Sequence, residues 1–265
     1  MRFDDKVALI TGAARGIGAC VALQFAKEGA SIVALDITQD IPAIDYSLGN
    51  VSDLEKVVND VKKMGRRAIG VIADVSKSAQ VKIAVDKAIV EFGKIDILVN
   101  NAGIILRSPF VNSTEEQIRA VIDVNINGCI FCCQHVIPHM ARQKYGKIVN
   151  ISSGASLRAE PGLSIYSATK YAVLGLTEAL AAELAYYNIN VNAVCPTGVR
   201  TGLNKGRQIA STADNYFRRE VTVEDIAAGV LFFASEEARN ITSTWIPVTA
   251  GVEKKTPSLE PYFTV

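Results

Sequence analysis

Short apolar runs alternate with longer segments of helical periodicity along almost the whole chain of 265 residues. Several of these runs consist largely of valine, isoleucine and leucine, which is typical of strands covered by helices on both faces. Such an alternation predicts βαβ units and a parallel sheet. The predicted strands are Val7–Thr11, Ser31–Asp36, Arg67–Ala73, Ile95–Asn100, Gly146–Ser152, Ile189–Val194 and Thr244–Pro247. We therefore expect an α/β fold, with one doubly wound domain over residues 1–265 and a seven-stranded, mostly parallel sheet between helices.

The segments between these strands have helical periodicity, with one exception. Residues 37–53 show no helical period and contain proline, glycine, asparagine and aspartate, which break regular structure. Long loops inside a compact domain are usually functional or disordered, so we expect an inserted surface loop here. The predicted helices are Gly16–Glu28, Leu54–Met64, Ala79–Phe92, Thr114–Met140 and Ser167–Tyr186.

The charge balance is close to neutral, with a formal net charge of +1. Such a chain offers no field that would hold nucleic acid or an anionic membrane. Its first five residues lack the apolar stretch of a secretory signal, and no apolar run approaches the roughly 20 residues that span a bilayer. The cysteines are odd in number and mostly lie in apolar contexts, which suits reduced, buried thiols and a cytoplasmic protein. They are Cys20, Cys129, Cys132, Cys133 and Cys195.

His135 and His139 have the i,i+4 spacing that can hold a metal ion on a helix face. However, no glutamate follows the first histidine in the metalloprotease pattern, Pro138 disturbs the turn, and the chain has no third histidine. We expect a structural or interface role for both histidines and no metal site.

Residues Thr11–Gly18, with the sequence TGAARGIG, follow the first predicted strand and open the first predicted helix. Gly12 allows a sharp turn, while Gly16 and Gly18 let the backbone approach a pyrophosphate and let the helix pack on the sheet. The helix N-terminus adds free N–H groups and a partial positive charge for the phosphates. This context of strand, turn and helix indicates a dinucleotide site of the Rossmann type, and Ile17 is included among its residues.

Asp36 lies twenty residues after Gly16, at the end of the second predicted strand. A carboxylate there accepts hydrogen bonds from a ribose 2′-hydroxyl and repels a 2′-phosphate, which favours NAD over NADP. Arg15 leaves the alternative open, because a guanidinium in the glycine loop can receive a 2′-phosphate. We also keep the simpler interpretation that Asp36 only ends a strand.

Tyr166 and Lys170 lie four residues apart on one predicted helix face, and Ser153 ends a predicted strand thirteen residues before the tyrosine. A phenol of pKa about 10 is a poor base at neutral pH, and lowering that pKa to about 7 requires roughly 4 kcal/mol. A lysine one turn away and a positively charged nicotinamide ring favour the phenolate. The Ser153 hydroxyl is suited to hold a substrate oxygen. A Tyr/Lys pair is usually a surface feature, but here it belongs to the sheet that carries the glycine loop.

The motifs now in hand resemble the short-chain dehydrogenase/reductase family, from Lys6 to Gly251. The residues that carry the resemblance are Thr11–Gly18, Asp74-Val75, Asn100-Asn-Ala-Gly103, Asn125, Ser153, Tyr166-Ser-Ala-Thr-Lys170 and Pro196 through Thr201. The resemblance implies a dehydrogenase or ketoreductase, and family members are commonly homotetramers.

The resemblance also implies roles for individual residues. Asp74 and Val75 would contact the adenine, Asn101 would line the adenosine side, and Gly103 would keep the backbone close. Asn125 would bend its helix and hold a water that links Lys170 to solvent. The carboxamide end of the nicotinamide would lie against Val199 and Thr201. Tyr166 would be the general acid/base, with Lys170 lowering its pKa, and both would also contact the cofactor.

Three features resemble a narrower branch, the carveol-dehydrogenase-like and mycofactocin-coupled enzymes. They are the insert with IDYSL at residues 44–48 and its flanking residues, the Pro196-Thr-Gly-Val199 sequence, and the Tyr166–Lys170 motif within an Ala/Leu-rich helix. That branch is NAD-linked, acts on secondary alcohols including terpenoids, and sometimes retains its nicotinamide under the inserted loop. Val248-Thr-Ala-Gly251 departs from the family, which usually has an aspartate in place of the threonine.

Three hypotheses follow from the sequence. The first is an NAD-dependent dehydrogenase of a cyclic or terpenoid-like secondary alcohol. The second is an NADPH-dependent ketone or 3-oxoacyl reductase, and the third is a non-catalytic dinucleotide-binding scaffold. The substrate pocket is expected between residues 104–110, 153–164 and a lid at 202–219, where Arg107 and Arg158 suit a polar or anionic substrate or are simply solvated.

Overall fold

The computed structural model of the chain describes residues 1–199 and 215–251. In this part, seven strands form one sheet in the order β3-β2-β1-β4-β5-β6-β7, and every neighbouring pair is parallel. The strand order reverses between β1 and β4, so the predicted doubly wound fold is confirmed. The strands are β1 (Val7–Thr11), β2 (Ser31–Asp36), β3 (Ala68–Ile72), β4 (Ile97–Asn100), β5 (Gly146–Ile151), β6 (Ile189–Pro196) and β7 (Thr244–Val248), whose ends differ from the predicted ones by at most two residues.

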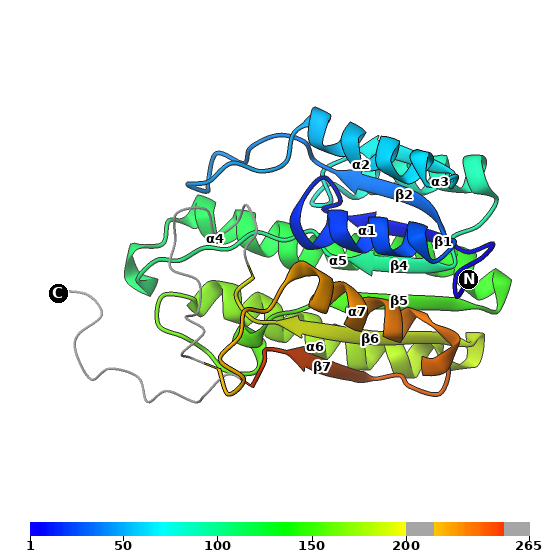
Figure 1. Ribbon diagram of the computed structural model, residues 1–265. Coiled ribbons are helices and arrows are strands. Elements are labelled where there is room, and N and C mark those ends of the chain that lie inside the picture. Colours follow the sequence, from blue (N-terminus) through cyan, green and yellow to red (C-terminus); the bar gives the residue numbers. More distant parts are fainter. Residues whose placement is uncertain (200–214, 252–265) are drawn as a thin grey trace.

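Helices cover both faces of the sheet (Figure 1). The helices α1 (Gly16–Lys27), α2 (Val51–Lys63) and α7 (Val223–Ala234) share one face and one hydrophobic core, and α7 is not among the predicted helices. The helices α3 (Ser78–Phe92), α5 (Gly128–Gln143) and α6 (Ser164–Leu184) cover the other face and a second core. All five cysteines are free and buried, as expected.

The inserted loop ends earlier than predicted because a capping box starts α2 at Val51. The Asn50 side chain accepts a hydrogen bond from Asp53 N, and the Asp53 carboxylate accepts one from Asn50 N, both at 3.0 Å. The irregular loop is therefore residues 37–50. It packs against the protein, with Ile41, Ile44 and Leu48 on the second core.

The predicted helix Thr114–Met140 is not one regular helix. The helix α4 (Glu115–Ile122) passes through one π-helical turn, Asp123–Asn127, before α5. Among the described residues, the stretch Glu115–Gln143 is long and apolar enough to cross a membrane by length and composition alone, and 44% of its most apolar part is buried in the protein. Val136 and Met140 of α5 are fully buried in the second core, and a core helix meets the same criteria.

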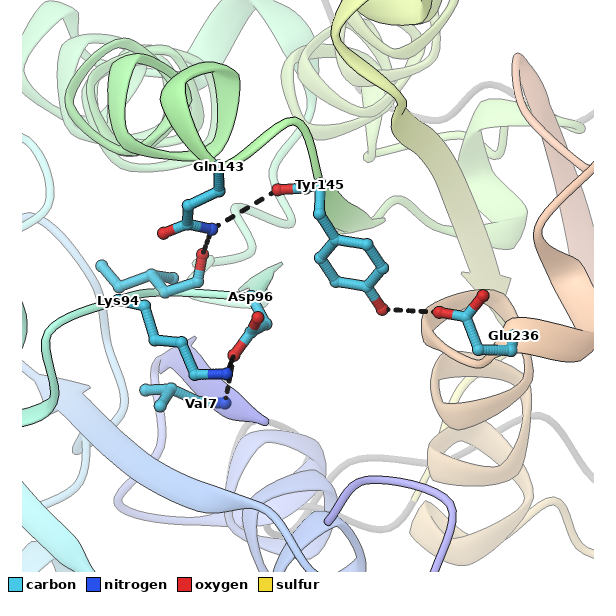
Figure 2. Close-up of polar contacts among 7 residues, drawn as sticks. Val7, Lys94, Asp96, Gln143, Tyr145 and Glu236 are labelled. Carbon is cyan, nitrogen blue, oxygen red and sulfur yellow. Dashed lines mark hydrogen bonds and ion pairs between the residues drawn. The ribbon is translucent and has the colours of Figure 1, made fainter. Parts of the chain in front are cut away.

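Polar side chains tie the strands together at the amino edge of the sheet (Figure 2). The Asp96 carboxylate accepts a hydrogen bond from Val7 N at 2.8 Å and pairs with Lys94 Nζ at 3.1 Å. Tyr145 Oη donates to Glu236 Oε1 at 2.8 Å, and Lys147 Nζ donates to Asn190 Oδ1 at 2.7 Å. The polar side chains named above are thus paired with other groups of the protein. We therefore look for a ligand site at the carboxyl edge.

Candidate active site

A cleft of about 450 Å³ lies at the carboxyl edge of the sheet. It follows the rule that ligands of doubly wound sheets bind where the strand order reverses. Of the predicted residues within the described ranges, Gly18 and Asn125 do not line the cleft and lie directly behind it, while Thr201 falls outside those ranges. The predicted residues that line it are Gly12, Arg15, Gly16, Ile17, Asp36, Asp74, Val75, Asn101, Gly103, Ser153, Tyr166, Lys170 and Val199.

The glycine loop has the shape that a pyrophosphate cradle requires. Gly12 and Gly16 have positive φ angles of 64° and 58°, which favour glycine. A Cβ on Gly18 would collide with the Gly12 carbonyl oxygen, and one on Gly12 would lie 2.9 Å from Ala102 Cα. The loop thus presents bare backbone at the start of α1, and its residues fit the phosphates of a dinucleotide.

Asn101 holds this loop in place. Its Nδ2 atom donates to Thr11 O at 2.8 Å and to Gly12 O at 3.1 Å, so its amide is used by the protein itself. Asp74 and Val75 lie further along the cleft, where the Asp74 carboxylate accepts from Ser76 N at 2.9 Å and Val75 is buried. The geometry is compatible with the adenine contacts that the resemblance implies.

Asp36 and Arg15 are both fixed by backbone contacts. The Asp36 carboxylate accepts hydrogen bonds from Ala14 N at 2.9 Å and Thr38 N at 3.0 Å, and its residue is only 7% exposed. Arg15 Nη2 donates to the carbonyl oxygen of Ser47, in the inserted loop, at 2.6 Å. The Asp36 side chain is therefore fixed at the wall of the cleft, while the Arg15 guanidinium is directed to the inserted loop.

Tyr166 and Lys170 lie in the first two turns of α6, and Ser153 lies just after β5. Lys170 Nζ is 5.7 Å from the centre of the Tyr166 ring and donates to Ile151 O at 2.9 Å. Burial lowers the pKa of Lys170 to about 8. The predicted trio is thus brought together at one wall of the cleft.

The expected lowering of the Tyr166 pKa by Lys170 is not seen in the protein alone. Burial raises this pKa, a hydrogen bond with Ser153 opposes the rise, and Cys195 adds a smaller increase. The cause is desolvation, which penalises a phenolate more strongly than one serine hydroxyl stabilises it. The second charge in the prediction, that of the nicotinamide ring, belongs to the bound cofactor.

Asn125 lies in the π-helical turn between α4 and α5. Its Oδ1 accepts from Ile104 N at 2.8 Å, and its Nδ2 donates to Ile104 O at 2.9 Å and to Thr169 Oγ1 at 3.1 Å. A π-helical turn shifts the carbonyl ladder by one residue and is frequent at functional sites. Asn125 therefore connects the loop after β4 to helix α6.

The sequence did not single out Tyr46, which fastens the inserted loop over the cleft. Its hydroxyl accepts from Ile105 N at 2.8 Å and donates to Ile105 O at 3.3 Å. Ile105 lines the cleft. A tyrosine within an otherwise irregular loop is the signal that could have pointed to this contact.

Val248-Thr-Ala-Gly251 lies closer to the cleft than its position near the end of the chain suggested. Val248 O accepts from Thr197 N at 3.2 Å, and Thr249 lines the cleft. Gly251 O accepts from Tyr216 N at 2.7 Å, at the described end of the predicted lid. Residues 202–214 of that lid lie outside the described residues.

The two histidines have ordinary side-chain partners. His135 Nε2 lies 2.9 Å from Ser78 Oγ, and His139 Nδ1 lies 3.0 Å from Arg142 Nη2. These contacts are in keeping with the expected structural role.

Comparison with known proteins agrees with this geometry. The family model described as short chain dehydrogenase matches residues 6–212. The chain belongs to the short-chain dehydrogenase family. It is 37% identical to the (-)-trans-carveol dehydrogenase of Rhodococcus erythropolis, over 96% of this chain and 99% of that protein. It is 36% identical to a 3-oxoacyl-[acyl-carrier-protein] reductase of Thermotoga maritima, over 95% and 99% of the two chains.

Solved structures of other short-chain dehydrogenases share this fold. The carveol dehydrogenase of Mycobacterium avium in complex with NAD superposes with a TM-score of 0.89 at 33% identity, over 94% of this chain and 98% of that chain. These relatives show that the chain is an oxidoreductase of the alcohol dehydrogenase/ketoreductase kind. The bound NAD of such neighbours supports a nicotinamide cofactor.

Proposed function

We propose that this short-chain dehydrogenase transfers hydride between a secondary alcohol and NAD, with Tyr166 as the general acid/base. One observation carries the proposal: Ser153, Tyr166 and Lys170 line the same cleft as Asp36 and the glycine loop. A site for a dinucleotide and a site for proton transfer thus lie in one continuous space. Bound NAD supplies the hydride acceptor.

The residues act on the substrate oxygen. The Ser153 hydroxyl, which also accepts from Ala155 N at 3.1 Å, binds that oxygen and orients the carbinol carbon. Tyr166 accepts the hydroxyl proton as the hydride leaves, and it returns a proton in the reverse direction. Lys170, as a cation one helical turn away, favours the phenolate, and Asn125 anchors the water through which its proton exchanges with solvent.

NAD is favoured over NADP by the contacts of Asp36 and Arg15. The Asp36 carboxylate faces the cleft as an acceptor for ribose hydroxyls, and it would repel a 2′-phosphate. A Cβ on Gly49 would lie 2.7 Å from Ala14 Cβ and 3.8 Å from Asp36 Oδ1, so the inserted loop packs closely over the carboxylate. The bond of Arg15 to Ser47 O directs the guanidinium to the inserted loop, which supports NAD over NADP.

The substrate side of the cleft favours a cyclic or terpenoid-like alcohol. Its described walls include the apolar side chains of Ile104, Ile105, Leu157, Leu163 and Pro247. These apolar side chains suit a hydrophobic ring that carries one hydroxyl. Arg107 and Arg158 also line the cleft, and each pairs with Glu160. The similarity to two carveol dehydrogenases supports the same substrate class.

The alternative is an NADPH-dependent ketone or 3-oxoacyl reductase, which the similarity to the Thermotoga maritima reductase supports. A non-catalytic scaffold is disfavoured because Asn125, Ser153, Tyr166 and Lys170 are all present and assembled. We also expect a cytoplasmic protein that forms homotetramers. Light scattering after size-exclusion chromatography measures the mass of the oligomer.

A panel of cyclic, terpenoid, steroid and polyol secondary alcohols, assayed with NAD and with NADP, tests the proposal. We expect NADH formation with NAD and at least one cyclic alcohol, and none with Tyr166→Phe. An absorbance scan of the purified protein detects any retained NADH. Tighter binding of NADPH than of NADH, with reduction of ketones alone, would contradict the proposal and support the reductase.

A further inference from the structure

A small cavity lies directly behind Lys170, on the side away from the cleft. Its volume is about 10 Å³, close to the smallest space that holds one water molecule. It lies between the carboxyl ends of the central strands and the helices α5 and α6. The residues that line it are Thr11, Val75, Asn100, Ala102, Asn125, Gly128, Cys129, Ile151, Lys170 and Val173.

Asn100 presents an acceptor that has no partner within the described residues. Its side chain is at the end of β4, the residue is 6% exposed, and Oδ1 is buried without a hydrogen bond. Its Nδ2 atom is fully used, because it donates to Asn150 Oδ1 at 2.9 Å and to Cys133 Sγ at 3.3 Å. A buried acceptor left unpaired is destabilising, so a partner is expected.

A chain of hydrogen bonds fixes which way the Asn100 amide points. The Thr177 hydroxyl donates to Val173 O at 2.7 Å, so its oxygen accepts from Asn150 Nδ2 at 2.9 Å. The Asn150 Oδ1 atom is therefore the acceptor that faces Asn100, so Asn100 must donate from its NH₂ group. A flipped Asn100 would place two acceptors against each other. This series of hydrogen bonds ends at Asn100 Oδ1, which has no partner among the described residues.

Lys170 supplies the matching donor. Its ammonium group has three N–H donors, and Ile151 O takes one of them. The residue is 4% exposed, so each remaining donor needs a partner nearby. The Cys129 sulfur, whose hydrogen is directed to Asn150 Oδ1 at 3.6 Å, is only a weak acceptor for such a donor.

We propose that one ordered water occupies this cavity, accepts a hydrogen bond from Lys170 Nζ and donates one to Asn100 Oδ1. Asn100 is then a positioning residue, which holds the lysine from behind while the other side of the ammonium faces the cleft. Its kinetic consequence rests on the proposed function. Without the water, Lys170 loses a fixed orientation toward Tyr166, and the phenolate that accepts the alcohol proton becomes harder to form.

Asn100→Leu removes the acceptor at nearly constant volume, and Thr177→Val is the matched control. The control breaks the same buried chain, at its far end, without touching the cavity. We expect both variants to lose stability. Only Asn100→Leu should move the rising limb of kcat/KM for alcohol oxidation to higher pH, by about one pH unit, or roughly tenfold in rate at a fixed pH on that limb.

A crystal structure of the wild-type protein with NAD tests the water directly and does not depend on folding of the variant. Electron density for a water within hydrogen-bond distance of both Lys170 Nζ and Asn100 Oδ1 supports the inference. A dry cavity, or equal pH profiles for Asn100→Leu and Thr177→Val, overturns it. Wild-type turnover of alcohols is scored separately, so failure of the proposed function is distinguishable from failure of this inference.

Discussion

Two Tyr/Lys pairs lie at opposite edges of the same sheet, and each joins a half-buried tyrosine to a buried lysine. At the amino edge, Lys147 Nζ is 5.8 Å from the centre of the Tyr145 ring, and at the carboxyl edge Lys170 Nζ is 5.7 Å from that of Tyr166. Both lysines are nearly inaccessible, at 2% and 4% exposure. Residue type, lysine burial and this distance are thus similar in the two pairs, although Lys6 Nζ lies nearer to the Tyr145 ring, at 3.7 Å from its centre.

The hydrogen-bond partners of the two phenols differ. Tyr145 donates to the Glu236 carboxylate, and burial together with this anion raises its pKa far above the usual value. Tyr166 instead has Ser153, which favours the phenolate, and it lines a cleft of about 450 Å³. Of the two pairs, the one at the carboxyl edge is therefore the one for which we propose acid/base work, because its phenol faces a ligand space and an uncharged partner.

The largest expected effect is that of Tyr166→Phe. Removal of the proton acceptor should lower kcat/KM for the alcohol by about 10³-fold, because positioned acid/base groups contribute roughly 10²–10⁴. Steady-state NADH formation measures it, with circular dichroism as the control for folding. If Tyr166→Phe retained near wild-type activity, Tyr166 would have no more part in proton transfer than Tyr145.

Lys170→Met should change how stability depends on pH. Burial gives Lys170 a folded pKa of about 8, below its ordinary value of 10.5. The folded state therefore binds fewer protons than the unfolded state between these values, and the wild-type free energy of unfolding rises with pH across that window, by at most about 3 kcal/mol. Lys170→Met should lose this rise.

Denaturant unfolding of both proteins at several pH values between about 8 and 10.5 gives the comparison. Groups distant from Lys170 titrate equally in the two proteins, so the difference between their slopes reports the lysine together with Cys129 and Cys195, whose pKa values its charge lowers. Parallel curves for wild type and Lys170→Met would show that Lys170 is not destabilised by burial.

Two aspartates extend the comparison to the cofactor. Asp36→Asn should weaken NAD binding by roughly tenfold and narrow the preference over NADP, because it removes the charge that faces the ribose. Asp96→Asn, at the amino edge, removes a charge that only pairs with Lys94 and Val7 N. Asp96→Asn should lower the free energy of unfolding and leave the dissociation constants of both cofactors unchanged. Fluorescence titrations with NADH and NADPH measure both variants.

The smallest expected effect is that of Tyr145→Phe. It removes one hydrogen bond to Glu236 and should cost about 1 kcal/mol of unfolding free energy, with kcat/KM unchanged. Loss of activity without loss of stability would mean that the amino edge takes part in the reaction.

The sequence alone predicted the sheet and most of the cleft because these features depend on local patterns. The valine- and isoleucine-rich runs give the seven strands, and the glycine loop lies between a strand and a helix whatever the rest of the chain does. Tyr166 and Lys170 share a helix face through their spacing alone. These inferences needed no knowledge of contacts between distant segments.

The features that the sequence did not predict depend on such contacts. Tyr46 meets Ile105 across 59 positions of the chain, and Asn100 meets Asn150 across 50. No periodicity signals either pair. The pKa of Tyr166 also depends on how deeply the folded protein buries it, and in the protein without its cofactor burial raises that pKa.

Deuterium transfer tests the central claim most directly. A secondary alcohol labelled with deuterium at the carbinol carbon is incubated with NAD and either wild-type protein or Tyr166→Phe, and the nicotinamide product is analysed by mass spectrometry. We predict NADH that carries the deuterium with the wild-type protein and almost none with the variant. Absence of labelled NADH with every alcohol of the panel, or equal labelling by Tyr166→Phe, would contradict the account.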